Sequence, residues 1–288
     1  MMQGDAGTGR LPVGPVQRKL TTAIDALLAV ATCGVILGWI LEQPVLYRPA
    51  APVMSAFTAL SLLIMVLVRQ ARLHLETWPL ALGLAMTGLV LGGNASSITM
   101  LAVMPPELWA SFSGLVLTSA MTSLGLILFC AYDLVITLRD TPRSAFLVDD
   151  MLIHLALVPG GVSLLGYLLG NPTYLSVHAD PRVGISPLEM GFMALYAAGA
   201  VLSNPGLFLW RFLAAGRVNR LVFAGLFANQ FLAPVVAARL FSTPGSSGPG
   251  VELFVMLAGV VTTLTFLLLQ ARVSRLRAGS GSGPDPGR

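Results

Sequence analysis

Apolar residues follow one another along this chain in long, nearly continuous stretches, which short polar segments separate. A transmembrane helix needs about 20 such residues to cross roughly 30 Å of hydrocarbon, whereas the strands of a membrane barrel are about ten residues long and alternate in polarity. The pattern therefore predicts an all-α, polytopic integral membrane protein with about eight transmembrane helices. The predicted spans are residues 20–41, 51–68, 77–93 or 77–103, 109–134, 145–170, 187–203, 221–241 and 251–270.

The connections on one side of the predicted spans share a sequence pattern. In segments 105–109, 186–189 and 249–252, a proline precedes an acidic residue near the start of the next span. We therefore interpret the eight spans as four sequential helical hairpins. The chain divides into an N-terminal tail (1–19), an eight-helix membrane domain (20–270) and a C-terminal tail (271–288) that is first basic and then rich in Gly, Ser and Pro.

The composition agrees with a membrane protein and excludes a conventional soluble enzyme. Apolar residues make up 55% of the 288 residues, charged residues make up only 10%, and the mean hydropathy is +0.80. An ordinary soluble domain has about 25% charged residues. The two cysteines, Cys33 and Cys130, both lie in apolar stretches. We expect free, buried thiols there and no disulfide.

The basic residues are distributed unevenly between the two sides of the predicted helices. Fourteen of the 17 Lys and Arg residues lie in the N-terminal segment, in the connections after spans two, four and six, or in the C-terminal tail. Cytoplasmic connections of membrane proteins collect Lys and Arg. We therefore predict that both termini are cytoplasmic and that the number of spans is even. The net charge of +4 is explained by this topology, and the sequence predicts the lipid bilayer, but no nucleic acid, as a partner.

Two segments resemble a known bacterial module. Residues 166–174 read Gly-Tyr-Leu-Leu-Gly-Asn-Pro-Thr-Tyr, and residues 52–60 read Pro-Val-Met-Ser-Ala-Phe-Thr-Ala-Leu. They are similar to two elements of the multi-span membrane input regions that precede GGDEF diguanylate cyclase and histidine kinase domains: a Gly-Tyr/Trp-Leu-x-Gly loop and a Met-x-x-x-Thr-Ala-Leu helix. Spans three and four depart from this pattern. The resemblance implies a sensor for signal transduction in the bacterial inner membrane. Because no output domain follows span eight in this sequence, we expect a separate protein partner.

The sequence leaves two other classes of function open. One is a small transporter or an accessory subunit of a membrane complex, and the other is a membrane enzyme that acts on a lipid, polyprenyl or pigment substrate. The phosphate loop, the His-Glu-x-x-His zinc motif, the Cys-x-x-Cys motif and the Gly-x-Ser-x-Gly nucleophile elbow do not occur in the sequence. The sequence therefore favours a non-enzyme and predicts no catalytic residue, no metal and no cofactor, and it does not identify a small-molecule ligand.

Ionisable residues inside the predicted spans are the candidates for function, because charge is costly within a membrane. Asp25 lies in the first span. It either reaches the cytoplasmic interface, pairs with Arg18, Lys19 or a loop arginine, or takes part in the function itself.

A second candidate site lies at the beginning of span five, where Asp149 and Asp150 precede His154. Asp150 and His154 are four residues apart, so they share one face of a helix. A carboxylate beside an imidazole forms a pair that responds to protons, and the same groups are the acid–base candidates if the protein is an enzyme. The alternative is that both acids complement the dipole at the helix N-terminus.

Four acidic residues lie on the predicted outer side, namely Glu42, Glu107, Glu189 and Glu252. The segment 186–189 reads Ser-Pro-Leu-Glu, in which serine at the N-cap, proline at the first helical position and glutamate at the third form a capping box. We expect Glu107 and Glu252 to cap their helices in the same manner. Alternatively, the four glutamates form a ring around an outer mouth that binds a cation or a basic ligand.

The dipeptide Tyr132-Asp133 in span four matches one half of the intramembrane aspartyl protease signature. The partner motif Gly-x-Gly-Asp does not occur in the sequence. We therefore interpret the match as a coincidence.

Overall fold

The computed structural model describes residues 13–46, 52–75, 80–105, 118–138, 147–175, 184–241 and 251–280. Within these ranges the chain is almost entirely helical and contains no β-strand. The fold is therefore all-α, as the hydrophobic pattern predicts. The elements are α1 (Pro15–Ile40), α2 (Ala56–His74), α3 (Leu80–Val103), α5 (Ala120–Leu138), α6 (Leu147–Leu169), the short 3-10 helix η1 (Pro172–Tyr174), α7 (Pro187–Ser203), α8 (Phe208–Ala214), α9 (Arg217–Phe241) and α10 (Val251–Ser280).

Most of these helices are long and apolar enough to cross a membrane. In the described part of the chain, seven helices meet this condition: α1, α2, α3, α5, α6, α9 and α10. An eighth crossing is obtained if α7 and α8, which meet at a bend of 74°, are one broken span. These helices confirm the prediction of a polytopic α-helical membrane protein.

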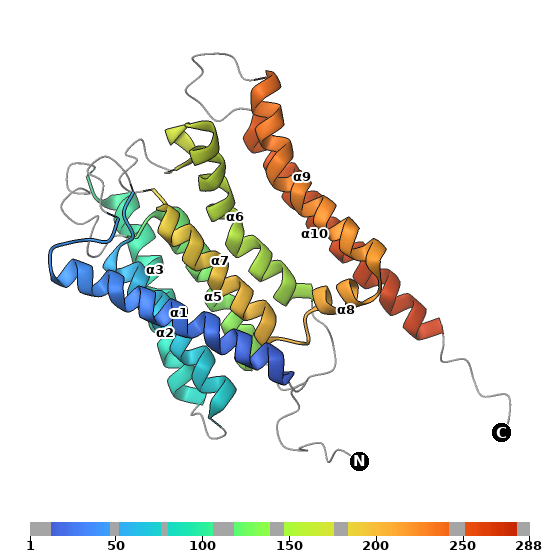
Figure 1. The fold of residues 1–288 in the computed structure, drawn as a ribbon, viewed down its shortest axis with the longest axis horizontal. Coiled ribbons are helices and arrows are strands. Elements are labelled where there is room, and N and C mark those ends of the chain that lie inside the picture. Colours follow the sequence, from blue (N-terminus) through green and yellow to red (C-terminus); the bar gives the residue numbers. More distant parts are fainter. Residues whose placement is uncertain are drawn as a thin grey trace.

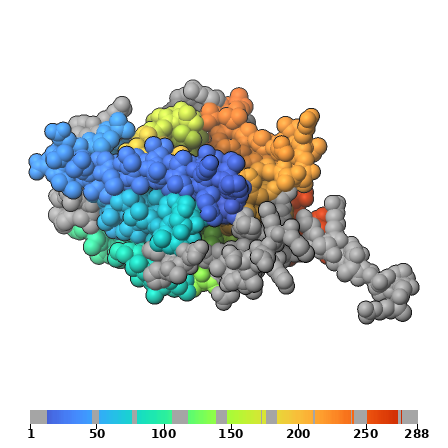
Figure 2. Space-filling view, turned by 60° about the horizontal axis from the view of Figure 1, so that its bottom comes forward, coloured from blue at the N-terminus to red at the C-terminus, as the bar shows by residue number. Residues whose placement is uncertain are grey.

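The helices form one bundle with a hairpin at its edge. α1 packs against both α2 and α7, and α5 packs against α3 and α6. The α9–α10 hairpin lies beside α6, and the short α8 connects it to α7 (Figure 1). Figure 2 shows that α1, in dark blue, lies on the outside of the bundle. The beginning of α1 and the end of α10 lie at the same end of the molecule (Figure 1).

Three helices, α2, α5 and α10, continue past the ends that the sequence predicts; α5 ends at Leu138 rather than at residue 134. α2 extends to His74 rather than ending at residue 68, so Arg69 and Arg72 belong to the helix and not to a loop. The reason is that Arg69 is buried against other helices, and its charge therefore does not mark the membrane boundary. α10 likewise continues past the predicted end at residue 270, through the basic segment, to Ser280.

The cysteines are free, as predicted, but only one of them is buried. Cys130 lies inside the bundle, whereas Cys33 is exposed. Cys33 belongs to α1, which lies on the outside of the bundle and exposes much of its surface (Figure 2).

Side chains of two serines fix the beginnings of α2 and α7. The backbone N–H of Thr58 donates to Ser55 Oγ at 3.0 Å. In α7 the backbone N–H of Glu189 donates to Ser186 Oγ at 3.2 Å, and the N–H of Ser186 donates to Glu189 Oε2 at 2.7 Å. This reciprocal arrangement confirms the capping box predicted for residues 186–189.

An apolar layer fills the middle of the bundle. Leu62 and Met65 of α2, Leu126 and Phe129 of α5, and Met193 of α7 are all essentially inaccessible to solvent and belong to one core cluster. Buried polar side chains occur along α2 and α7 on both sides of this layer. The fold therefore presents two separate groups of polar residues, one toward each end of the bundle.

Candidate functional site

A cluster of polar and ionic side chains, all buried except the half-buried Arg72, joins four helices at the end of α2. We call it the ionic cluster; it consists of Asp25, Arg69, Arg72, Asp133 and Tyr196. Arg69 Nε donates to Asp25 Oδ2 at 2.9 Å, and a second guanidinium nitrogen donates to Asp25 Oδ1. Both side chains are at most 1% exposed. This is a two-point arginine–carboxylate contact, the geometry in which such a pair is strongest.

Arg69 also binds α7 through Tyr196. A third guanidinium nitrogen donates to the backbone oxygen of Tyr196 at 3.0 Å. The guanidinium carbon lies 4.1 Å from the centre of the Tyr196 ring, so the cation also interacts with the aromatic face. Gly199 makes this approach possible, because a Cβ atom there would lie 2.7 Å from an Arg69 nitrogen.

Asp133 of α5 forms the other half of the ionic cluster. The Tyr196 hydroxyl donates to Asp133 Oδ2, and a guanidinium nitrogen of Arg72 donates to Asp133 Oδ1 at 3.1 Å. Arg72 donates as well to Thr137 Oγ1 at 3.0 Å. Tyr196 therefore contacts both ion pairs, through its ring on one side and its hydroxyl on the other.

The charges of the ionic cluster cancel, since it contains two aspartates and two arginines. A buried ion pair is tolerated only when both partners and their remaining hydrogen-bonding groups are satisfied, and removal of one partner typically costs about 3–5 kcal/mol. Ionisable residues at membrane depth are expensive and are candidates for function by default. The arrangement thus couples the positions of α1, α2, α5 and α7 to one another.

The structure places the predicted candidate Asp25 in this cluster. Its partner is Arg69, with an additional hydrogen bond from Gln70 Nε2 to Asp25 Oδ2. The sequence anticipates a basic partner for Asp25 but assigns Arg69 to a loop. Asp133, dismissed as part of a coincidental motif, is a member of the same cluster.

Asp150 and His154 have separate surroundings in the structure. The two carboxylate oxygens of Asp150 accept from the backbone N–H groups of Phe208 and Leu209, at 2.9 and 3.0 Å. Asp150 therefore caps the beginning of α8, a different helix from its own. His154 instead faces Gln230 of α9. Its Nε2 atom and Gln230 Oε1 have no hydrogen-bond partner among the described residues.

The remaining candidates are spread over the structure. Asp149 is buried beside Asp150. Glu252 is buried and accepts from the Tyr174 hydroxyl at 2.6 Å. Glu42 is exposed in the turn that follows α1, and Glu107 lies outside the described residues. The three described glutamates of the predicted outer ring therefore have three different environments.

Glu189 is surrounded by hydroxyl groups rather than by arginines. Thr58 Oγ1 donates to Glu189 Oε1 at 3.2 Å. Ser55, Thr58 and Thr118, which we call the hydroxyl cluster, place their three oxygens 2.9–3.3 Å from one another. Glu189 and these three residues are all buried. Among the described contacts, the buried Glu189 carboxyl therefore accepts hydrogen bonds from neutral donors only.

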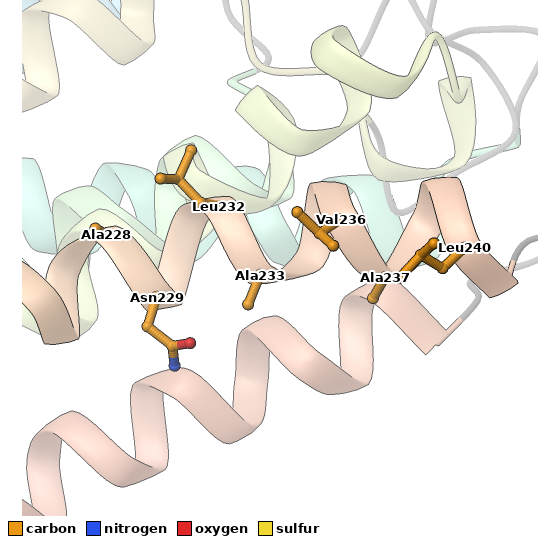
Figure 3. Close-up of a pocket in the computed structure, with 7 residues that line it drawn as sticks. All are labelled: Ala228, Asn229, Leu232, Ala233, Val236, Ala237 and Leu240. Atoms are coloured by element: carbon orange, nitrogen blue, oxygen red, sulfur yellow. The ribbon is translucent and has the colours of Figure 1, made fainter.

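A shallow groove runs along α9 and is lined by residues of that helix only (Figure 3). Asn229 is the one polar side chain among its lining residues, and it points toward α10 (Figure 3). The described residues contain no group of three His, Cys, Asp or Glu side chains that could hold a metal ion. The groove has the apolar character of a lipid-facing surface. The groove residues are Ala228, Asn229, Leu232, Ala233, Val236, Ala237 and Leu240.

Comparison of the chain with protein-family models, with curated proteins and with solved structures gave no match. The apolar helices define the class of the chain, a polytopic α-helical membrane protein, and the buried polar groups inside the bundle are the features that bear on its function.

Proposed function

We propose that this protein is a sensory or regulatory module of the bacterial inner membrane that acts through a separate protein partner. The observation that supports this proposal is the ionic cluster, in which four helices meet through mutually dependent contacts. Small local changes become large ones when packed elements have two discrete arrangements rather than a continuum. A signal that acts on one helix is then passed to the other three.

Tyr196 is the residue through which such a change passes. It contacts Arg69 with its ring and Asp133 with its hydroxyl. A shift of α7 relative to α2 therefore alters both ion pairs at once. Because each pair leaves a buried charge when it breaks, intermediate arrangements are costly and two states are favoured.

The proposed output surface is the side on which the basic residues gather, and it faces the cytoplasm in this proposal. Reporter fusions test this assignment. A reporter that is active only in the periplasm stays silent when fused after Arg277 and is active when inserted in segment 244–250. The reverse pattern contradicts the proposed orientation.

The proposal itself is tested by site-specific photo-cross-linking in native membranes. The cross-linker is placed at Leu75 or Val218, two exposed positions next to connections proposed to be cytoplasmic. We expect a discrete cross-linked protein whose yield changes at least about tenfold when Asp25→Asn breaks the ionic cluster, the change that about 1.4 kcal/mol produces in an equilibrium.

The matched control for this experiment is Glu42→Gln, which removes an exposed acid at the other end of α1. Its cross-linking yield stays at the level of the unmodified protein. Equal yields for Asp25→Asn and the unmodified protein, with equal amounts of both in the membrane, contradict a regulatory role for the ionic cluster.

A small transporter is the second candidate, and the buried oxygens around Glu189 favour it. Buried carboxyl and hydroxyl groups within a helical bundle are typical of ion and substrate pathways. Flux measurements on proteoliposomes distinguish the two functions. A sodium or proton flux that is lost in Glu189→Ala supports the transporter, whereas a regulatory module produces no such flux.

A further inference from the structure

The groove on α9 contains an exposed amide in the middle of a membrane span. Asn229 is the central residue of the 25 that make up α9 (Arg217–Phe241). At about 1.5 Å per residue it lies about 18 Å from either end of the helix, out of reach of the lipid headgroups. Its side chain points toward α10 (Figure 3) but remains exposed, and its amide forms no hydrogen bond with the described residues.

An amide in this position is costly, because lipid offers it no hydrogen-bond partner. Acyl chains suit the apolar residues of the groove but not the nitrogen and oxygen of Asn229. Amide side chains of membrane helices form hydrogen bonds with polar groups of other helices. Among the seven candidate spans in the described part of the chain, α9 has the smallest buried share, 22%. Its outward surface is therefore open to another membrane helix.

The surface around Asn229 has a ridge beside a hollow. Three large, exposed side chains follow one another at four-residue intervals and form the ridge. Asn229 begins a neighbouring row with the same spacing, in which the small side chains of Ala233 and Ala237 leave the hollow of the groove (Figure 3). Ridges with this spacing pack into the grooves of a second helix. The ridge residues are Leu232, Val236 and Leu240.

A helix surface with a ridge and a hollow side by side is complementary to itself. Copies of one membrane protein have the same orientation in the bilayer, so a closed pair is related by a two-fold axis along the membrane normal. This axis places each residue at the same depth as its counterpart in the other copy. Two Asn229 side chains then meet near the centre of the bilayer. Because an amide both donates and accepts, each one can bind the other.

We propose that α9 forms the interface of a homodimer, in which the Asn229 amides of two copies bind each other. The ridge of each copy packs into the hollow of the other, so the occupant of the groove is a second copy of this chain. The ionic cluster lies on α1, α2, α5 and α7 and takes no part in this contact. The inference is therefore independent of the regulatory role proposed above.

The test is resonance energy transfer between donor- and acceptor-labelled copies of the full-length protein in liposomes, measured over a series of protein-to-lipid ratios. We expect transfer that falls on dilution and fits a monomer–dimer equilibrium. Asn229→Leu keeps the size of the side chain and removes its hydrogen bonds, so it raises the dissociation constant about tenfold. Because the Asn229 side chain is exposed, this substitution leaves the folded monomer intact.

Disulfide cross-linking in membranes tests the position of the interface. Ala233→Cys is combined with Cys33→Ala, so that the new thiol on α9 replaces the exposed thiol on α1. We expect oxidation to give a covalent dimer, and Asn229→Leu to lower its yield. The protein with Cys33 and no added cysteine gives no covalent dimer, because α1 lies outside the proposed interface. Equal yields from the two positions overturn the proposal.

The matched control for energy transfer is Thr99→Val. Thr99 is also exposed within a span, but its hydroxyl donates to the backbone oxygen of Ala95 in its own helix at 3.0 Å. Its helix, α3, lies on the side of the bundle away from α9 (Figure 1). This variant keeps the dissociation constant of the unmodified protein. Transfer that is absent at every protein density leaves the groove to lipid or to another membrane protein and overturns the proposal. An unchanged dissociation constant in Asn229→Leu places the contact elsewhere and overturns it as well.

Discussion

The ionic cluster and the hydroxyl cluster bury carboxyl groups at opposite ends of α2 and α7 in two different ways. Asp25 and Asp133 face the arginines of α2, whose guanidinium groups donate to both carboxylates. Glu189 accepts from a backbone N–H and from the Thr58 hydroxyl. Arginine only donates hydrogen bonds, whereas a hydroxyl donates or accepts. The ionic cluster therefore depends on the charges of its carboxylates, whereas the surroundings of Glu189 tolerate the loss of the carboxylate charge.

The two clusters also differ in the helices that they hold together. The ionic cluster ties α7 to three other helices through side chains that depend on one another. At the other end, the Glu189 carboxyl belongs to the capping box of its own helix, and its contact with α2 is one hydrogen bond from Thr58. Substitutions in the ionic cluster should therefore lower the free energy of unfolding more than substitutions around Glu189.

The largest effect is expected for Arg69→Met, which leaves Asp25 buried without its ionic partner. Removal of one member of a buried ion pair lowers the free energy of unfolding by about 3–5 kcal/mol. Unfolding of the purified protein in detergent measures this loss. The control is the double variant Asp25→Asn with Arg69→Met, which removes both charges and recovers at least half of the stability. Equal stability of the single and double variants contradicts a direct coupling of the two residues.

The second-largest loss of stability is expected for Tyr196→Phe. This substitution keeps the ring over Arg69 and removes only the hydroxyl that donates to Asp133. A hydrogen bond to a charged group is worth about 1.5–3 kcal/mol. Tyr167→Phe is the matched control, since its hydroxyl donates to the neutral backbone oxygen of Ile185. We expect a smaller loss there, and chemical unfolding of both variants gives the comparison. A larger loss for Tyr167→Phe contradicts the shared role of Tyr196.

Gly199→Ala tests the close approach of α7 to Arg69. A methyl group at this position would lie 2.7 Å from the Arg69 nitrogen that donates to Asp25 Oδ1 and 3.3 Å from that oxygen, so this contact has to rearrange. Overpacking of this kind costs about 1–3 kcal/mol. Gly191 lies on the same helix and has no atom within 4 Å of an added Cβ, so Gly191→Ala is the control and leaves Tm unchanged or higher. Similar losses in both variants attribute the effect to the helix rather than to the ionic cluster.

The long helices and their order were predictable from the sequence, whereas the short α8 between α7 and α9 was not. Continuous apolar stretches identify the spans, and the Ser-Pro-Leu-Glu segment identifies the beginning of α7 because capping is a local property. The end of α2 was not predictable in the same way. A charge such as that of Arg69 marks the membrane boundary only if it has no partner inside, and its partner, Asp25, belongs to another helix.

The candidate site was predictable only in part for the same reason. Asp25 is found by the rule that ionisable residues in spans are costly. Asp133 satisfies that rule as well, since it lies inside the predicted span four, so the rule could have identified it from the sequence. Tyr196 could not be identified from the sequence, because a tyrosine in a span resembles any other aromatic residue until the packing of α7 against α2 and α5 is known.

The smallest effect is expected for Glu189→Gln, and it separates the two clusters most clearly. A glutamine oxygen accepts from the Ser186 N–H as the glutamate does, so the capping box is kept. The amide nitrogen then faces Thr58, whose hydroxyl rotates to accept instead of donating. We expect a loss below about 1 kcal/mol, the scale of one net hydrogen bond. The equivalent change Asp25→Asn points an amide nitrogen at Arg69, which has no acceptor to offer, and the loss is several times larger. Unfolding of the two variants under identical conditions makes the comparison, and equal losses contradict the assignment of charge to one cluster and neutral hydrogen bonds to the other.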